Sequence, residues 1–195
     1  MAILSVTRAP ILNTRAQVLV LPVNTAGILL DPILMRTQTL YADNYRQYRR
    51  ACLESWLTTG SCLMHKRQRE HAGLGASSNG NQPQYIANLT IARHPYHDPK
   101  MVWLNAALMD LKQQLTKLIR YDGVRRIAIF ARPLLSLCSN DSVIAADAIE
   151  NAASEMEDTA LSASDTAVLA LFDELKDVPR LRIDIHLPRL PTLSA

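Results

Sequence analysis

Hydrophobic residues along this chain alternate between short runs with the period of a β-strand and longer segments with the period of an α-helix. Short apolar or alternating runs bounded by polar stretches are typical of strands. The predicted strands are residues 2–7, 16–21, 61–66, 85–91, 126–131 and 181–187. Two longer segments, 33–56 and 100–121, carry hydrophobic residues at helical spacing and are predicted to be helices. This alternation predicts an α/β protein with a mostly parallel or mixed sheet between helices.

Polar stretches separate these predicted elements. Residues 66–82 are rich in glycine and polar side chains and predict an exposed loop, and residues 94–99 predict a turn. Residues 139–159 contain acidic side chains and not one basic side chain, and their alanine content favours a helix. A further helix is predicted to begin at Ser164, because serine is a good cap and Asp165 follows it.

The length of 195 residues predicts one domain over residues 1–190, with an acidic helical insertion at about 137–161 and a C-terminal tail at 188–195. A formal net charge of +3 gives no global electrostatic case for binding nucleic acid or a membrane. The three cysteines lack paired spacing and indicate free thiols in a reducing compartment. No apolar run approaches the roughly 20 residues that span a bilayer. We therefore expect a cytoplasmic protein, or a component of a cytosolic or viral assembly.

The end of the second predicted strand is the first candidate for a ligand site. An apolar run stops abruptly there in the small-residue turn Asn24, Thr25, Ala26, Gly27. Strands that end in such turns and lead into helices are where α/β proteins place ligands, and the Asn24 amide can both donate and accept hydrogen bonds. The alternative is that Asn24 only turns the chain, since Asn and Gly are common turn residues.

Two other groups of reactive side chains are weaker candidates. His94, His97 and Asp98 have a spacing that zinc ligands can show, but a structural zinc site needs four ligands, and we see no fourth. Histidine and aspartate beside proline are also ordinary turn residues. Cys138 has no paired base nearby in the sequence, so we interpret it as a buried cysteine rather than a nucleophile. We expect no bound metal and no cofactor.

Charged segments suggest surfaces for a partner. The first long helix bears Arg46, Arg49 and Arg50 on one side, and this basic face could meet phosphate or an acidic protein surface. A merely solvated face is the alternative. The acidic segment 139–159 could be a lid, a partner-binding helix or a solvated insertion, and the residues do not decide among these.

Several of these stretches together resemble a known family. V-L-P-V-N-T-A-G-I-L-L-D-P-I at residues 20–33, followed by Y-A-D-N-Y-R-Q-Y-R-R-A-C at 41–52, resembles the first third of a macrodomain. The likeness is greatest to the bacterial antitoxin type that removes ADP-ribose from DNA, in which VNTVN precedes a small residue and G-V-M-G-K-G. Further on, Y-I-A-N-L-T-I-A-R-H at 85–94 resembles that family's I-x-N-F-P-T-K-x-H. The resemblance implies a three-layer α/β/α fold with a mixed central sheet.

The ligand residues of the family carry over only in part. Asn24 falls on the asparagine that faces the distal ribose, and Gly27 falls on the glycine that follows it. The family's first asparagine is replaced by Leu21, and its G-K-G by residues 30–32, L-D-P. Proline has no N–H group to offer a diphosphate, and a carboxylate beside one is repulsive.

Two further family features are replaced. Pro10 stands where an acid or amide usually holds the adenine, and P-L-L-S-L at 133–137 replaces the glycine-rich phosphate loop. We therefore predict a degenerate ADP-ribose pocket with weak or absent binding, in a non-catalytic interaction or structural module. The alternatives are a binder of ADP-ribose or a related nucleotide through Asn24, Thr25 and Gly27, and an ADP-ribosyl hydrolase acting on modified nucleic acid or protein. The second would be an ADP-ribosyl glycohydrolase with Asn24 as its one candidate catalytic residue.

Overall fold

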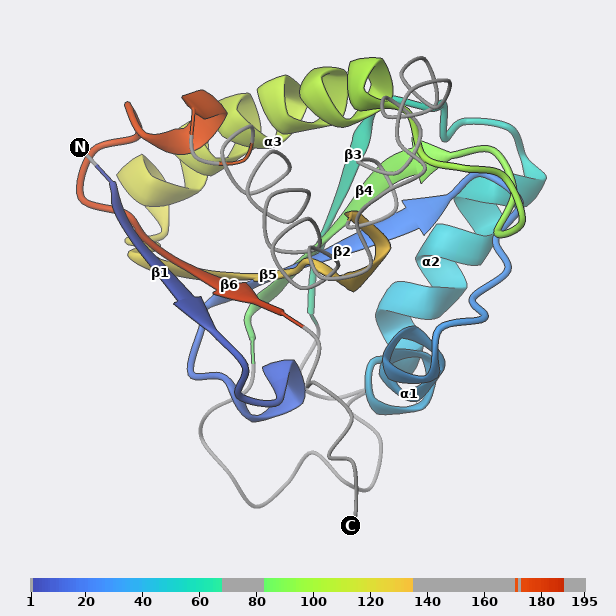
Figure 1. The fold of residues 1–195 in the computed structure, drawn as a ribbon, viewed down its shortest axis with the longest axis horizontal. Helices are drawn as coiled ribbons and strands as arrows, with labels where there is room; N and C mark the ends of the chain where they lie inside the picture. Colours follow the sequence, from blue (N-terminus) through green and yellow to red (C-terminus); the bar gives the residue numbers. More distant parts are fainter. Residues whose placement is uncertain (1, 68–82, 135–170, 172, 188–195) are drawn as a thin grey trace, which may run out of the picture.

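A six-stranded mixed sheet forms the centre of the fold in the computed structural model, which describes residues 2–67, 83–134, 171 and 173–187 (Figure 1). The strands are β1 (Ile3–Thr7), β2 (Val18–Asn24), β3 (Cys62–Lys66), β4 (Tyr85–Ala92), β5 (Arg126–Phe130) and β6 (Arg182–His186). Their order across the sheet is β1-β6-β5-β2-β4-β3, and β3 alone is antiparallel to its neighbour. All six predicted strands are confirmed.

Strand β2 extends three residues beyond the predicted end at residue 21 and includes Pro22. A proline in a central strand removes a backbone donor from the ladder. The pairing of β2 with β5 covers only Val18 to Val20, so at Pro22 the strand has β4 as its paired neighbour. The central strand therefore tolerates proline near its carboxyl end, where the sheet opens.

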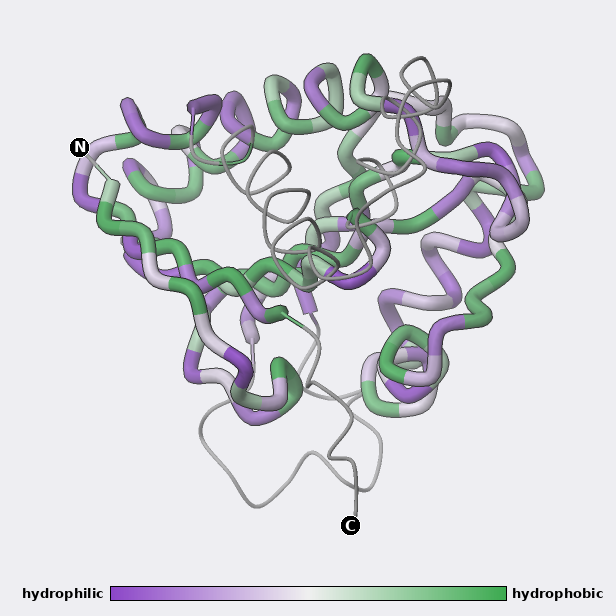
Figure 2. Tube along the Cα trace, viewed as in Figure 1, coloured by the Kyte–Doolittle hydropathy of each residue, from purple (hydrophilic) through white to green (hydrophobic). Residues whose placement is uncertain are grey.

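Helices cover both faces of the sheet (Figure 1). Helix α3 (Met101–Tyr121) packs on one face through Leu104, Leu108, Leu111 and Leu115, which are all fully buried. Helices α1 (Pro32–Leu40) and α2 (Ala42–Leu53) cover β2, β4 and β5 on the other face. The three layers agree with the predicted α/β/α architecture. Figure 2 shows the central strands as mainly hydrophobic and α2 as largely hydrophilic.

The prediction of one helix over 33–56 is wrong. The backbone leaves the helical region at Tyr41, with φ −126° and ψ 57°, so the segment forms two helices. The chain then leaves α2 before Trp56, whose side chain is 68% exposed. Hydrophobic spacing continued through Tyr41 because its ring is buried, and neither glycine nor proline marks the break.

A short 3-10 helix, η1 (Ile11–Asn13), connects β1 to β2. Residues 171 and 173–175 are helical, which agrees with the end of the helix predicted from Ser164. The predicted exposed loop lies outside the described residues apart from residues 66 and 67, and the acidic segment 139–159, the C-terminal tail and Cys138 lie wholly outside them. Among the described helices, none combines the length and apolar character that crossing a membrane requires.

Candidate ligand cleft

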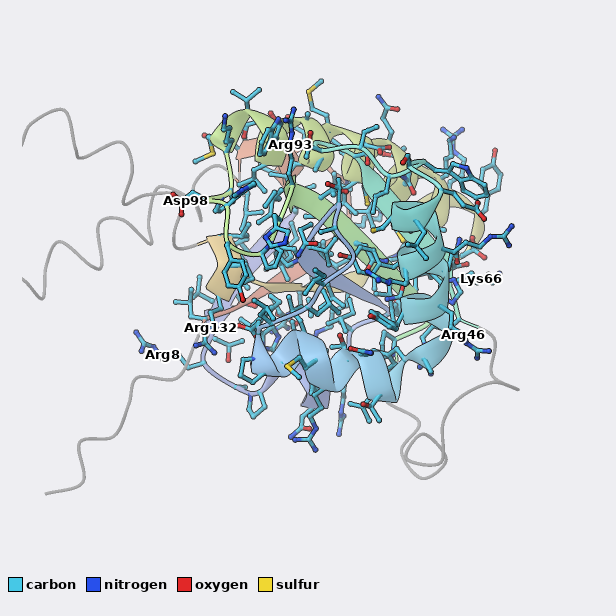
Figure 3. All side chains as sticks on the ribbon, turned by 90° about the vertical axis from the view of Figure 1, so that its right-hand side faces the viewer. Arg8, Arg46, Lys66, Arg93, Asp98 and Arg132 are labelled. Atoms are coloured by element: carbon cyan, nitrogen blue, oxygen red, sulfur yellow. The ribbon has the colours of Figure 1, made fainter. Side chains whose placement is uncertain are left out.

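An open cavity of about 370 Å³ lies at the carboxyl ends of β2 and β4, and we call it the Asn24 cleft. Its lining comes from three parts of the chain: residues 22–24, 28–31 and 34; residues 91, 92 and 94–99; and Arg132 with Pro133 after β5. Figure 3 shows Asp98 and Arg132 on one side of the molecule, above the first helix. Because the carboxyl ends of parallel strands meet at one sheet edge, loops that are distant in sequence converge here.

Asn24 lines this cleft, but its amide is hydrogen-bonded within its own turn. Its Nδ2 donates to the Ile28 carbonyl at 2.6 Å, and the Ile28 N–H donates to its Oδ1 at 3.3 Å. The Tyr48 hydroxyl donates to the Asn24 carbonyl at 2.6 Å, and burial raises the pKa of that hydroxyl. These contacts support the turn interpretation of Asn24, and its predicted role toward a ribose stays a prediction.

Thr25 and Gly27 do not line the cleft. The Thr25 hydroxyl donates to the Arg93 carbonyl at 3.1 Å, which ties the turn to the end of β4. Gly27 has φ +72°, and a Cβ added there would lie 2.9 Å from Nη1 of Arg49. The structure therefore explains this glycine by its backbone conformation and by close packing against Arg49. Their predicted role in ligand binding stays a prediction.

The predicted basic face of the first helix is not one surface. Arg49 is directed inward and donates to the carbonyls of Ala26 and Gly27 at 2.9 and 3.2 Å. Arg46 and Arg50 are both exposed, and Arg50 forms an ion pair with Glu54 at 2.8 Å. Helical spacing predicts that these arginines lie on one side of the helix. It does not predict which arginine side chain forms hydrogen bonds with the loop before the helix.

Asp31 is the N-cap of α1 and forms an ion pair with Arg132, which also lines the cleft. Its Oδ1 accepts from the backbone N–H of Ile33 at 2.8 Å and of Leu34 at 3.4 Å, and its Oδ2 lies 3.4 Å from Nε of Arg132. A carboxylate thus occupies the helix N-terminus, where a bound anion would be favoured. In the described part of the chain, the backbone N–H groups of Leu29, Leu30 and Asp31 make no hydrogen bond.

Sequence analysis weighed residues 94–99 as a turn or as part of a zinc site, and the structure places them at the cleft. His94, Tyr96, His97 and Asp98 all line it, and the His94 ring lies 5.3 Å from the Tyr96 ring and 5.6 Å from the His97 ring. The signal available in the sequence was the position of this turn directly after a strand. Arg132 carries the same signal after β5.

The described residues leave the cleft open. Leu134, which follows Pro133 of the cleft lining, is fully buried in the core beneath α3, and Leu30 is 45% exposed at the rim. Burial raises the pKa of the Cys52 and Cys62 thiols, which disfavours the thiolate forms.

Within residues 2–67, 83–134 and 173–187, no three His, Cys, Asp or Glu side chains gather as a metal site requires.

Comparison with solved structures places this architecture among macrodomains. The macrodomain of Thermus aquaticus DarG superimposes with a TM-score of 0.66 at 18% identity, over 96% of this chain and 100% of that one. The macrodomain of Mycobacterium tuberculosis DarG gives 0.65 at 16% identity, over 97% and 100%. Thermosipho africanus DarTG in complex with ADP-ribose gives 0.66 at 17% identity, over 97% of this chain and 43% of that one. This chain therefore has the macrodomain fold.

One curated protein matches at the level of sequence. It is the DNA ADP-ribosyl glycohydrolase of Thermus aquaticus, which is 27% identical over 122 residues. The match covers 63% of this chain and 30% of that protein, so most of the relative's length has no counterpart here. No profile of a known protein family matches the chain.

Proposed function

We propose that this chain binds an ADP-ribosyl group weakly in the Asn24 cleft, as a non-catalytic module. The observation that carries the proposal is the open cavity of about 370 Å³ at the carboxyl ends of two parallel strands, beside Arg132 and the loop of Leu29, Leu30 and Asp31. The solved structure of Thermosipho africanus DarTG in complex with ADP-ribose, on which this chain superimposes, supports the same ligand class.

The chemistry of the cleft suits a nucleoside diphosphate sugar. Arg132 is half exposed and offers guanidinium N–H groups that suit phosphate oxygens. The loop before α1 adds backbone N–H donors, which cradle diphosphates in many nucleotide sites. Tyr96, with 79% of its surface exposed, and the histidines beside it offer ring faces for a base or sugar.

The same residues limit the affinity. The Asp31 carboxylate occupies the first N–H groups of α1 and pairs with Arg132, so a diphosphate competes with a charge the protein already holds. A like-charge contact of this kind costs on the order of 1 kcal/mol, or about fivefold in the dissociation constant. We therefore expect a dissociation constant of about 10 μM or weaker for ADP-ribose.

Calorimetric titration with ADP-ribose tests this proposal. Arg132→Gln should weaken binding about fivefold or more, because it removes the cation of the cleft. Arg46→Gln is the matched control, since Arg46 is exposed on α2 and does not line the cavity. Equal affinities for the two variants, or no heat with the unaltered chain at millimolar ADP-ribose, would refute the proposal and leave a structural module without this ligand.

Removal of ADP-ribose from DNA is the second candidate function. It is favoured by His94, His97 and Asp98, which line the cleft and could move a proton at the reacting bond. The name of the Thermus aquaticus relative describes that activity. The assay is release of ADP-ribose from an ADP-ribosylated oligonucleotide. Release that is lost in both His94→Gln and His97→Gln supports the enzyme, whereas binding without release supports the non-catalytic module.

A further inference from the structure

A second cavity, of about 480 Å³, lies on β1, β6 and β5, and we call it the Asp184 pocket. It shares no lining residue with the Asn24 cleft. Asp184 stands beside Ser5 of β1 and Ala128 of β5 in the sheet register, and Ala128 belongs to the core beneath α1 and α2. The pocket is therefore on that face of the sheet, with the segment around η1 at its border. The chain of this segment follows the lower end of β1 in Figure 1.

The floor of the Asp184 pocket is a carboxylate that orients two arginines. Asp184, whose side chain is 4% exposed, accepts from the Ser5 hydroxyl, from Nε of Arg126 at 2.5 Å and from Nε of Arg182 at 3.1 Å. Burial alone would raise the pKa of this carboxyl, but the hydrogen bonds from Ser5, Arg126 and Arg182 outweigh it, so the pKa lies below its usual range. Asp184 is thus ionised at neutral pH, and both guanidiniums are fixed through Nε.

Positive charge exceeds negative charge in the Asp184 pocket. Arg126 and Arg182 keep 37% and 53% of their side chains exposed, and no hydrogen bond of their terminal Nη groups occurs in the described part of the chain. Arg15 lines the same pocket from the loop after η1 and makes no side-chain hydrogen bond to a described residue. Three arginines therefore face one carboxylate there, and Asp184 is the one acidic side chain among the described residues that line the pocket.

A buried histidine in this lining also has an unused nitrogen. His186 is 5% exposed, and its Nδ1 donates to the Ala9 carbonyl at 2.9 Å. Its Nε2 is buried and has no hydrogen-bond partner among the described residues. Because Nδ1 carries the proton of the neutral ring, Nε2 is an acceptor, and leaving it unsatisfied is costly, so it calls for an O–H group of a ligand or a water molecule.

We propose that the Asp184 pocket binds the phosphate group of a phosphate-bearing ligand, as a site separate from the Asn24 cleft. Guanidinium groups held in place by a carboxylate present paired N–H donors that match phosphate oxygens. The excess of two positive charges over the Asp184 carboxylate suits a phosphate dianion or consecutive phosphodiesters. Free phosphate and the backbone of a nucleic acid share this chemistry.

Titration of the ¹⁵N-labelled chain with inorganic phosphate, at ionic strength matched with chloride, tests the site directly. Backbone amide shifts should change at residues 13–15 and 182–186. Arg15→Gln should weaken phosphate binding about threefold and Arg15→Gln with Arg182→Gln tenfold or more, whereas Arg120→Gln should leave it unchanged. Arg120 is the matched control because it is exposed at the end of α3, outside the pocket.

Two results would overturn the proposal: amide shifts that avoid the Asp184 pocket, or equal losses of affinity in the Arg15 and Arg120 variants. Arg15→Gln removes an exposed side chain without a described hydrogen bond, so loss of folding is not expected to confuse the result. The amide signals of α3 report folding in each variant.

A short single-stranded oligodeoxynucleotide distinguishes the two sources of phosphate. Tighter binding than inorganic phosphate, with the same order of variants, assigns the pocket to a nucleic-acid backbone, and equal binding assigns it to free phosphate. Arg120→Gln should leave both titrations unchanged, because Arg120 lines neither cavity. Phosphate binding that survives in a chain without affinity for ADP-ribose would refute the proposed function and keep this second site.

Discussion

The Asn24 cleft and the Asp184 pocket each pair a carboxylate with arginine, with opposite results. In the cleft, one carboxylate meets one cation: Asp31 caps α1 and neutralises Arg132. In the pocket, one carboxylate holds two arginines through Nε, and a third arginine lines the wall. We therefore expect the number and orientation of the unpaired N–H donors, rather than the presence of arginine alone, to set how strongly each cavity binds an anion.

The largest predicted effect is the loss of stability in Asn24→Ala, which tests whether the Asn24 amide has a structural role in the cleft. Asn24→Ala should lower the free energy of unfolding by about 2 kcal/mol, because it removes both hydrogen bonds that the amide of the buried Asn24 makes with the Ile28 backbone. Urea denaturation measures this change. Thr25→Ala is the control, since it loses one exposed hydrogen bond and should cost about 0.5 kcal/mol. A fully stable Asn24→Ala variant would show that the amide is not needed for the turn.

A smaller loss of stability is expected from a substitution in the Asp184 pocket. Asp184→Asn should lower the free energy of unfolding by about 1–2 kcal/mol, because both arginines lose a charged acceptor while remaining partly solvated. Asp173→Asn, which breaks an exposed pair with Lys176, should cause no measurable change. Equal stability of the two variants would contradict the orienting role of Asp184.

The difference in stability between the unaltered chain and Asp184→Asn should depend on pH in a defined direction. The pKa of Asp184 is lowered in the fold, so its contribution is complete above the pKa of an unfolded aspartate, about 3.9, and is lost as the pH falls through the lower folded value. The chain and Asp184→Asn should therefore converge in stability over the pH interval below about pH 4. A difference that stays constant over that interval in acid denaturation would exclude this linkage.

Much of the fold could be predicted from the sequence because strands leave local signals. The buried run at Val18–Val20 and the leucines of α3 have the expected periods, and both elements form. The break at Tyr41 could not be predicted, because a buried aromatic side chain preserves the hydrophobic period while the backbone changes direction.

The sites depended on contacts that the sequence does not report. Asp31 was expected to repel a diphosphate, but its role as a cap and its pairing with Arg132, which follows another strand, depend on the strand order. Ser5 and Asp184 meet only because β1 and β6 pair across nearly the whole chain. The local sequence at His94–Asp98 predicts only the turn itself. Its position next to Asn24 follows from the parallel pairing of β2 and β4, which the local sequence does not show.

The role of Asp31 is the central claim, and calorimetric titration of Asp31→Ser with ADP-ribose tests it most directly. Serine still caps α1 but carries no charge, so stability should be nearly unchanged while Arg132 becomes free for the ligand. We expect ADP-ribose to bind this variant about fivefold more tightly than the unaltered chain. Unchanged or weaker binding by a folded Asp31→Ser variant would contradict the claim.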